Sequence, residues 1–191
     1  QYNGSSWTKL GQDIDGEAAG DNSGYAVSLS SDGTIVAIGA TYNNGNGTYS
    51  GHVRVYQYNG ESWTKLGDDI DGEATYDYSG QSVSLSSDGT IVAIGADEND
   101  GNGSNSGHVR VYQYSDSSWT QLGDDIDGEA RGDESGYSVS LSSDGAIVDI
   151  GDRLNSGNGN ISGHVRIYEI SKTQVQTTAT TSFRENRVVG T

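Results

Sequence analysis

Acidic side chains recur in one short segment of this chain, at a spacing that could hold a cation. The segment reads DIDGEAAGD at residues 13–21, and similar segments follow at 69–77 and 125–133. Calcium is bound by about six to eight oxygen atoms, several of them from carboxylates. An acidic turn whose side chains accept backbone N–H groups explains the same residues without a metal. We therefore expect no required cofactor, and the calcium candidates are Asp13, Asp15, Glu17, Asp21, Asp69, Asp71, Glu73, Asp77, Asp125, Asp127, Glu129 and Asp133.

A further Asp lies in the segment SSDGTIVAIGA, residues 30–40, which recurs at 86–96 and in altered form at 142–152. Asp-Gly is a strong hairpin signal, because both central positions of a type I′ turn have positive φ. The sequence therefore predicts that Asp32 and Gly33 form the turn between two strands.

The three histidines, His52, His108 and His164, occupy the same place in the segment SGHVR. Copies of one residue on successive repeats cannot converge on one substrate atom, whereas a catalytic site needs different residues within mutual reach. We therefore predict a protein that is not an enzyme, in which each His bonds to backbone groups at the start of a strand. Cysteine is absent, which excludes disulfides and thiolate metal sites.

Asn-x-Ser/Thr sequons lie in Gly- and Asn-rich segments that read as exposed loops. One lies near the start of the sequence, and one occurs in the same loop of each repeat, displaced by two residues in the third. Such sequons accept N-linked sugar in secreted proteins. The sequence therefore predicts an extracellular or cell-surface protein with N-linked glycans at Asn3, Asn46, Asn102 and Asn160.

The elements that carry these residues follow from a repeat of 56 residues, marked by the tryptophans at positions 7, 63 and 119. In the first unit, residues 27–30 alternate apolar and polar side chains, as on a half-buried strand. Residues 34–40 are almost continuously apolar, and residues 52–58 and 62–66 supply two more strands. Four short strands per unit without helical periodicity predict an all-β fold of β-propeller-type blades.

The repeat divides the chain into four parts. We place an N-terminal strand and the first blade in 1–62, the second blade in 63–118 and the third in 119–170. Residues 171–191 form a Thr-rich, basic tail that we expect to be extended.

The segment SGYAVSLSSDGTIVAIGA resembles the FG-GAP repeat of integrin-type β-propellers. The glycine of the opening motif matches residues 24, 80 and 136, and the closing Gly-Ala matches residues 39–40 and 95–96. The resemblance implies a propeller with calcium in some hairpins. The ligand positions that it implies beside Asp32 hold Ser28, Ser30 and Val36, so the resemblance favours a turn without calcium here.

The formal net charge of −17 makes nucleic acid a poor partner, because binding depends on cationic residues that neutralise phosphates. No apolar run approaches the about 20 residues of a membrane span.

Three blades are fewer than the about four to eight of known propellers. The third unit also ends without the Trp strand with which the sequence opens. We therefore predict an extracellular structural protein that assembles head to tail with other copies of itself, as a fibre or a ring, through strand complementation. The alternative is an adhesion or ligand-binding propeller with calcium-stabilised loops. The predicted assembly residues are Trp7, Val175, Phe183, Arg184 and Arg187.

Overall fold

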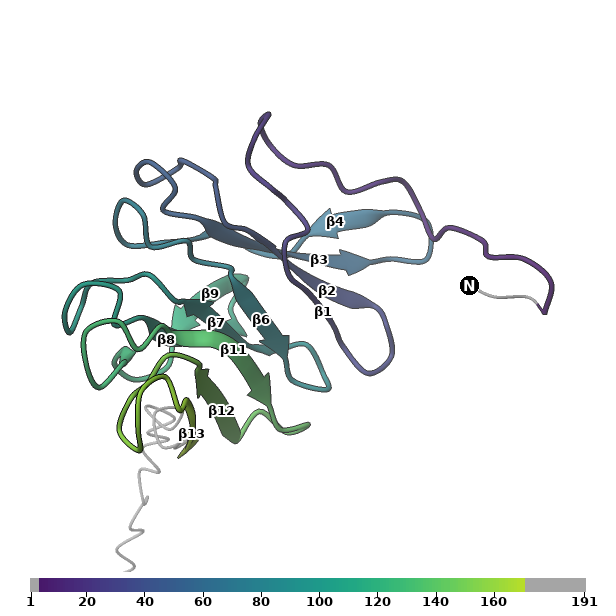
Figure 1. The fold of residues 1–191 in the computed structure, drawn as a ribbon. Helices are drawn as coiled ribbons and strands as arrows, with labels where there is room; N and C mark the ends of the chain where they lie inside the picture. Colours follow the sequence, from purple (N-terminus) through teal and green to yellow (C-terminus); the bar gives the residue numbers. More distant parts are fainter. Residues whose placement is uncertain (1–3, 171–191) are drawn as a thin grey trace, which may run out of the picture.

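The computed structural model describes residues 4–170, which form thirteen β-strands in three antiparallel sheets. The first sheet has the order β1–β2–β3–β4. A short strand, β5, also pairs with β3, at residues 52–53, whereas β4 pairs with residues 56–58. Figure 1 shows the three sheets following one another in chain order. The bounds in the first sheet are β1 Val27–Leu29, β2 Ile35–Ala40, β3 His52–Tyr58, β4 Trp63–Lys65 and β5 Ile70–Asp71.

The second sheet repeats this arrangement, whereas the third has three strands. The predicted all-β fold is confirmed, and residues 4–170 contain no helix that could cross a membrane. The bounds are β6 Ser82–Leu85, β7 Ile91–Ala96, β8 His108–Ser115, β9 Ser118–Gln121 and β10 Ile126–Asp127 in the second sheet, and β11 Ser135–Leu141, β12 Ile147–Asp152 and β13 His164–Glu169 in the third.

The sheets do not begin and end where the sequence repeats do. The predicted boundary between residues 62 and 63 separates β3 from β4, although Tyr58 pairs with Trp63 across that boundary. The next boundary separates β8 from β9 in the same way. Each of these sheets therefore takes its outer strand from the sequence unit that follows.

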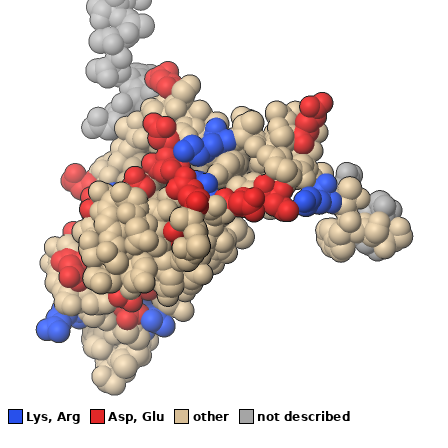
Figure 2. Space-filling view, turned by 90° about the horizontal axis from the view of Figure 1, so that it is seen from above, with Lys and Arg blue, Asp and Glu red and all other residues tan. Residues whose placement is uncertain are grey.

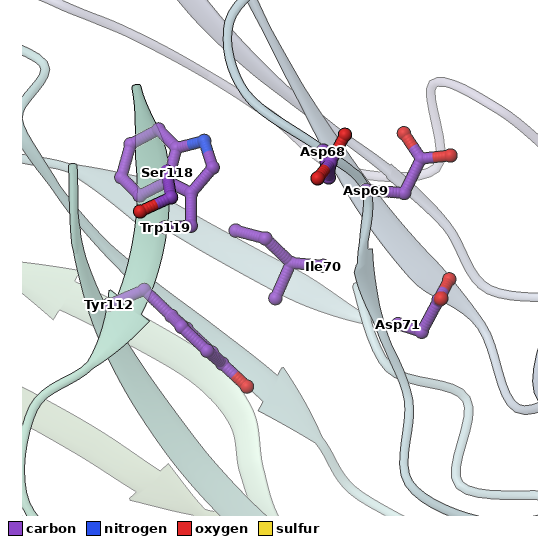
Figure 3. Close-up of a pocket in the computed structure, with 7 residues that line it drawn as sticks. All are labelled: Asp68, Asp69, Ile70, Asp71, Tyr112, Ser118 and Trp119. Carbon is purple, nitrogen blue, oxygen red and sulfur yellow. The ribbon is translucent and has the colours of Figure 1, made fainter. Parts of the chain in front are cut away.

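The two-residue strands β5 and β10 were not predicted. Ile70 is the single apolar residue in an acidic linker, and in the structure it is buried and pairs with Val53. Figure 3 shows Ile70 pointing toward Tyr112 and Trp119, while its neighbours Asp69 and Asp71 point away from them. The two sheets thus have five strands each instead of the four predicted.

Asp32 and Gly33 lie in the turn between β1 and β2, as predicted, but Asp32 does not have the positive φ that a type I′ turn requires. Gly33 has a φ of 71°, and its N–H donates to the carbonyl oxygen of Ser30. The carboxylate of Asp32 accepts hydrogen bonds from the Ser30 hydroxyl and from the backbone N–H and hydroxyl of Thr34. These bonds hold the pKa of Asp32 below its usual value, chiefly through the backbone N–H of Thr34.

The hydrophobic core lies between the sheets. Val53 and Val55 of β3 pack in one cluster with Val92 and Ile94 of β7, and a second cluster joins the second and third sheets. Backbone hydrogen bonds reinforce these junctions, because Ser31 N–H donates to the carbonyl oxygen of Ser87 at 2.9 Å. The sheets are therefore stacked units of one repeated design, and each needs a neighbour to bury its apolar faces.

Candidate functional site

The indole of each tryptophan in the second and third repeats binds to a site on the preceding unit, formed around Leu10 for Trp63 and around Leu66 and Gly67 for Trp119. This binding site is called here the tryptophan's seat. The indole N–H of Trp63 donates to the Leu10 carbonyl oxygen at 2.9 Å, and that of Trp119 donates to the Leu66 carbonyl oxygen at 2.8 Å. The ring of Trp119 also packs against Tyr114, with centroids 5.2 Å apart. A Cβ on Gly67 would lie only 2.9 Å from the indole of Trp119, so the seat depends on this glycine.

Among residues 4–170, the corresponding seat beside β13 holds no tryptophan. A groove of about 1,090 Å³ lies there, between the second sheet and the end of β13. A Cβ on Gly123, which is equivalent to Gly67, would meet nothing within 4 Å. The groove is lined by Leu122, Gly123, Ile126, Tyr168 and Ile170, the counterparts of the residues at and beside the Trp119 seat.

The segment that carries Trp7 lies at the opposite end of the stack, where Figure 1 shows it running away from the sheets. The Trp7 side chain is 82% exposed, in contrast to the half-buried Trp63 and Trp119. The predicted assembly residue Trp7 is therefore displayed to solvent. The other four, Val175, Phe183, Arg184 and Arg187, lie outside the described residues.

The two end sheets expose the apolar faces that are buried at the internal junctions. Val165 and Ile167 of β13 are 66% and 68% exposed, whereas the equivalent valines of β3 and β8 are buried. At the other end Leu29 is 59% exposed, although its counterpart Leu85 is buried. The stack therefore ends in two different apolar faces, called here the β13 face (Ile147, Val165 and Ile167) and the β1 face (Val27 and Leu29).

One residue beside the β13 face departs from the pattern of the other two repeats. Asp149 stands where the first two repeats have the fully buried Ala37 and Ala93. A carboxylate in this place disfavours the approach of another apolar sheet, because burying an unpaired charge is costly.

The four acids of the first loop, residues 13–21, do not converge on one point. Asp21 is buried and accepts hydrogen bonds from the Ala18 N–H and the Asn43 amide, and Asp13 pairs with Lys9 at 3.0 Å. Figure 2 shows Asp and Glu side chains gathered in a band on one face of the molecule. Within the described residues, the donor groups suited to a metal combine acids from two successive loops with a histidine.

Two such clusters occur, one at each linker between sheets: Glu17, His52 and Asp69, and Glu73, His108 and Asp125. One ring nitrogen of each buried histidine, Nε2 of His52 and Nδ1 of His108, has no hydrogen-bond partner. Burial lowers the pKa of both histidines. The sequence signal that could have revealed the clusters is the constant spacing of 35 and 17 residues between the members.

The carboxylates of the second cluster also affect one another. Burial raises the pKa of Glu73, the Arg110 guanidinium opposes this effect, and the neighbouring Asp125 adds to it. Arg110 Nη1 lies 3.5 Å from Glu73 Oε1. The cluster is therefore a partly buried site with more acidic than basic groups.

The sequons lie in the long loops, but two of their side chains have structural partners. The amide of Asn46 donates to the carbonyl oxygens of Gly72 and Glu73, and Asn102 makes the equivalent pair of bonds one repeat later. A glycan on this nitrogen leaves it one N–H, so glycosylation would remove one of the two bonds. Asn160 is exposed in its loop, and Asn3 lies outside the described residues.

Comparison with protein families matches residues 70–112 to the FG-GAP repeat, which confirms the resemblance found in the sequence. A comparison with curated protein sequences gave no match. Among solved structures, Kuenenia stuttgartiensis hydrazine synthase is similar over 83% of this chain and 36% of its own, with 12% identity and a TM-score of 0.49. The tricorn protease is similar over 74% and 13%, with 7% identity and a TM-score of 0.40. The chain thus spans about a third of the hydrazine synthase chain.

Proposed function

We propose that this chain, whose residues 70–112 are an FG-GAP repeat, is a structural building block that associates head to tail with further copies of itself. The observation that carries the proposal is the open groove beside β13, which repeats the walls of the Trp119 seat without its tryptophan. In the assembly, the segment around Trp7 of a second copy occupies this groove. The exposed indole of Trp7 becomes buried there, and burial of one aromatic side chain removes about 150–250 Å² from water.

The internal repeats define how the strands would pair. Within the chain, Tyr112 pairs with Gln121 and Gln113 with Thr120. Moving this register by one repeat in each direction places Tyr168 opposite Lys9 and Glu169 opposite Thr8 of the second copy. Among residues 4–170, one edge of β13 pairs with no strand, and an unpaired edge favours pairing with a further strand.

The apolar end faces support the same arrangement. When the Trp7 strand of a second copy pairs with β13, its first sheet lies against the β13 face, as the second sheet lies against the first within one chain. The β13 face and the β1 face are different surfaces, so the contact is heterologous. Repetition of a heterologous contact gives a ring if the rotation closes and a fibre if it does not.

The proposal also includes an extracellular or cell-surface location and the absence of catalytic activity. The three histidines occupy equivalent positions in separate units, which supports a role without catalysis. The repeated sequons support an extracellular or cell-surface location, with N-linked sugar on the exposed Asn160 and in the loops of Asn46 and Asn102.

Sedimentation analysis of the purified chain tests this function. We expect a mass above that of the monomer, rising with concentration, for the unmodified chain. Ile167→Asp should give monomers, because it places a charge at the centre of the β13 face. Ile161→Asp is the matched control, since Ile161 is 57% exposed in a loop outside that face and should leave the association unchanged.

A second substitution should strengthen the association instead of abolishing it. Asp149→Ala restores the residue of the other two repeats and should strengthen the association by about tenfold or more, because an unpaired charge leaves the contact. A folded, unmodified chain that stays monomeric at about 50 µM, together with an Asp149→Ala chain that is also monomeric, would refute the proposed function.

A further inference from the structure

The cluster of Glu73, His108 and Asp125 lies apart from the end faces, with His108 buried, Asp125 partly buried and Glu73 exposed. Nδ1 of His108 lies 3.9 Å from Glu73 Oε2 and 3.7 Å from Asp125 Oδ2. These separations are too long for hydrogen bonds. The His108 side chain is only 2% exposed, and its Nδ1 has no hydrogen-bond partner. A buried polar atom without a partner is destabilising, so a ligand for this nitrogen would stabilise the junction.

We propose that this cluster binds a divalent transition-metal cation of the zinc type. An imidazole nitrogen favours zinc and similar ions over calcium and magnesium, which prefer oxygen ligands. Tetrahedral zinc with bonds of about 2.0–2.2 Å places its ligand atoms about 3.4 Å apart. The observed separations of 3.7 and 3.9 Å require a closure of a few tenths of an ångström. Three protein ligands leave the fourth position to water.

The cluster of Glu17, His52 and Asp69 repeats this arrangement, with Nδ1 of His52 3.9 Å from Glu17 Oε2, but here the nitrogen without a partner is Nε2. Lys65 Nζ lies 2.9 Å from Asp69 Oδ1, so a cation already occupies one side of that carboxylate. In the second cluster the equivalent residue is the neutral Gln121, whose amide donates to Asp125 Oδ1 at 2.7 Å. A positive charge beside a ligand repels an incoming cation, so the second cluster should bind zinc more tightly.

The third repeat offers an internal control. Nε2 of His164 lies 2.6 Å from Asp152 Oδ2, and Asp152 stands where the other repeats have alanine. Glu129 lies 3.9 Å from Nδ1 of His164, but among the described residues no second loop acid completes a group of three.

Zinc titration of the metal-free chain, with binding followed by competition against a chromophoric chelator, tests the proposal. The titrations use chains that carry Ile167→Asp, so that Asp13 of a second copy cannot reach His164. We expect two zinc ions per chain, one bound more tightly. His108→Gln should remove the tighter site, Gln121→Lys should weaken it by about tenfold, and Lys65→Gln should strengthen the other site by a similar factor. Glu129→Gln should change neither.

Circular dichroism of each metal-free variant checks that it folds. If His108→Gln does not fold, Gln121→Lys decides the question, because lysine already occupies the equivalent position in the preceding repeat. The proposal is overturned if the chain binds no zinc at about 100 µM, if Gln121→Lys and Glu129→Gln act alike, or if excess calcium displaces the zinc. None of these outcomes depends on whether copies of the chain associate.

Discussion

Asp97→Thr should stabilise the folded chain strongly at pH 8 and have little effect at pH 4. Asp97 is 5% exposed at the end of the second sheet, where the first repeat has Thr41 and the third has Arg153. Burial, together with the nearby charges of Glu134 and Glu98, raises the pKa of Asp97 to about 7. The folded chain therefore favours the protonated form, whereas the unfolded chain ionises from about pH 4 upward.

The sign of the pH dependence follows from this difference. A raised pKa in the folded state means a contribution to stability that is complete below about pH 4 and is lost as the pH rises through about 7. A shift of about three units corresponds to roughly 4 kcal/mol, which we take as the upper bound of the gain at pH 8. Threonine at this position is already accommodated in the first repeat, where Thr41 is buried.

Urea unfolding of both chains at pH 4 and pH 8 provides the measurement. Asp116→Asn is the matched control, because Asp116 is exposed and its replacement should change the free energy of unfolding by less than about 0.5 kcal/mol. An equal gain at both pH values would show that the ionisation of Asp97 is not the cause.

Gly95→Ala should disrupt the fold, whereas Gly151→Ala should leave each chain folded and abolish association. A Cβ on Gly95 would overlap the backbone carbonyl oxygen of Gly136 in the next sheet, and a carbonyl cannot rotate away as a side chain can. We expect a loss of about 3 kcal/mol or more in the free energy of unfolding. A Cβ on the equivalent Gly151 would closely approach only the hydroxyl of Ser138, which can change its rotamer.

The effect on association follows from the residue that would face Gly151 in a second copy, as Gly136 faces Gly95 within the chain. Gly24 is the counterpart of Gly136, and a Cβ on Gly24 would meet nothing within 4 Å. In the proposed assembly the Gly24 carbonyl of a second copy lies against Gly151. Thermal unfolding and sedimentation of both variants separate the two effects. A Gly151→Ala chain that is folded and still associates would contradict the proposed stacking.

The repeated strands were predictable because their local signals agree. Asp32-Gly33 marks a turn, the alternation around Val27 and Leu29 marks a half-buried strand, and the continuous apolar run of β2 marks a strand covered on both faces. The sequence also shows that the tryptophan, which recurs at one fixed interval, is absent from the last unit, and among residues 4–170 no outer strand pairs with β13.

The contacts between units were not predictable in the same way. The acceptor of the Trp119 indole is a backbone carbonyl 53 residues away, and no side-chain pattern specifies it. The three members of the Glu73 cluster come from separate segments, so the acidic loops alone suggested a different set of ligands. The sequence shows that the second repeat has Asp97 where the first has Thr41. It does not show the burial that shifts the pKa of Asp97.

The proposed assembly depends on the pairing of the segment around Trp7 of one copy with β13 of another. Disulfide trapping tests it cleanly, because the chain has no cysteine of its own. Opposed residues on antiparallel strands have Cα atoms about 4.5–5.5 Å apart, within the range that a disulfide can bridge. A chain with Thr8→Cys, mixed with a chain with Glu169→Cys under mild oxidation, should give a linked dimer. In the off-register control, Val165→Cys replaces Glu169→Cys and lies four residues away on the same exposed strand. Rapid linkage to position 169 and little linkage to position 165 is the predicted result, whereas no linkage, or equal linkage to both positions, would contradict the account.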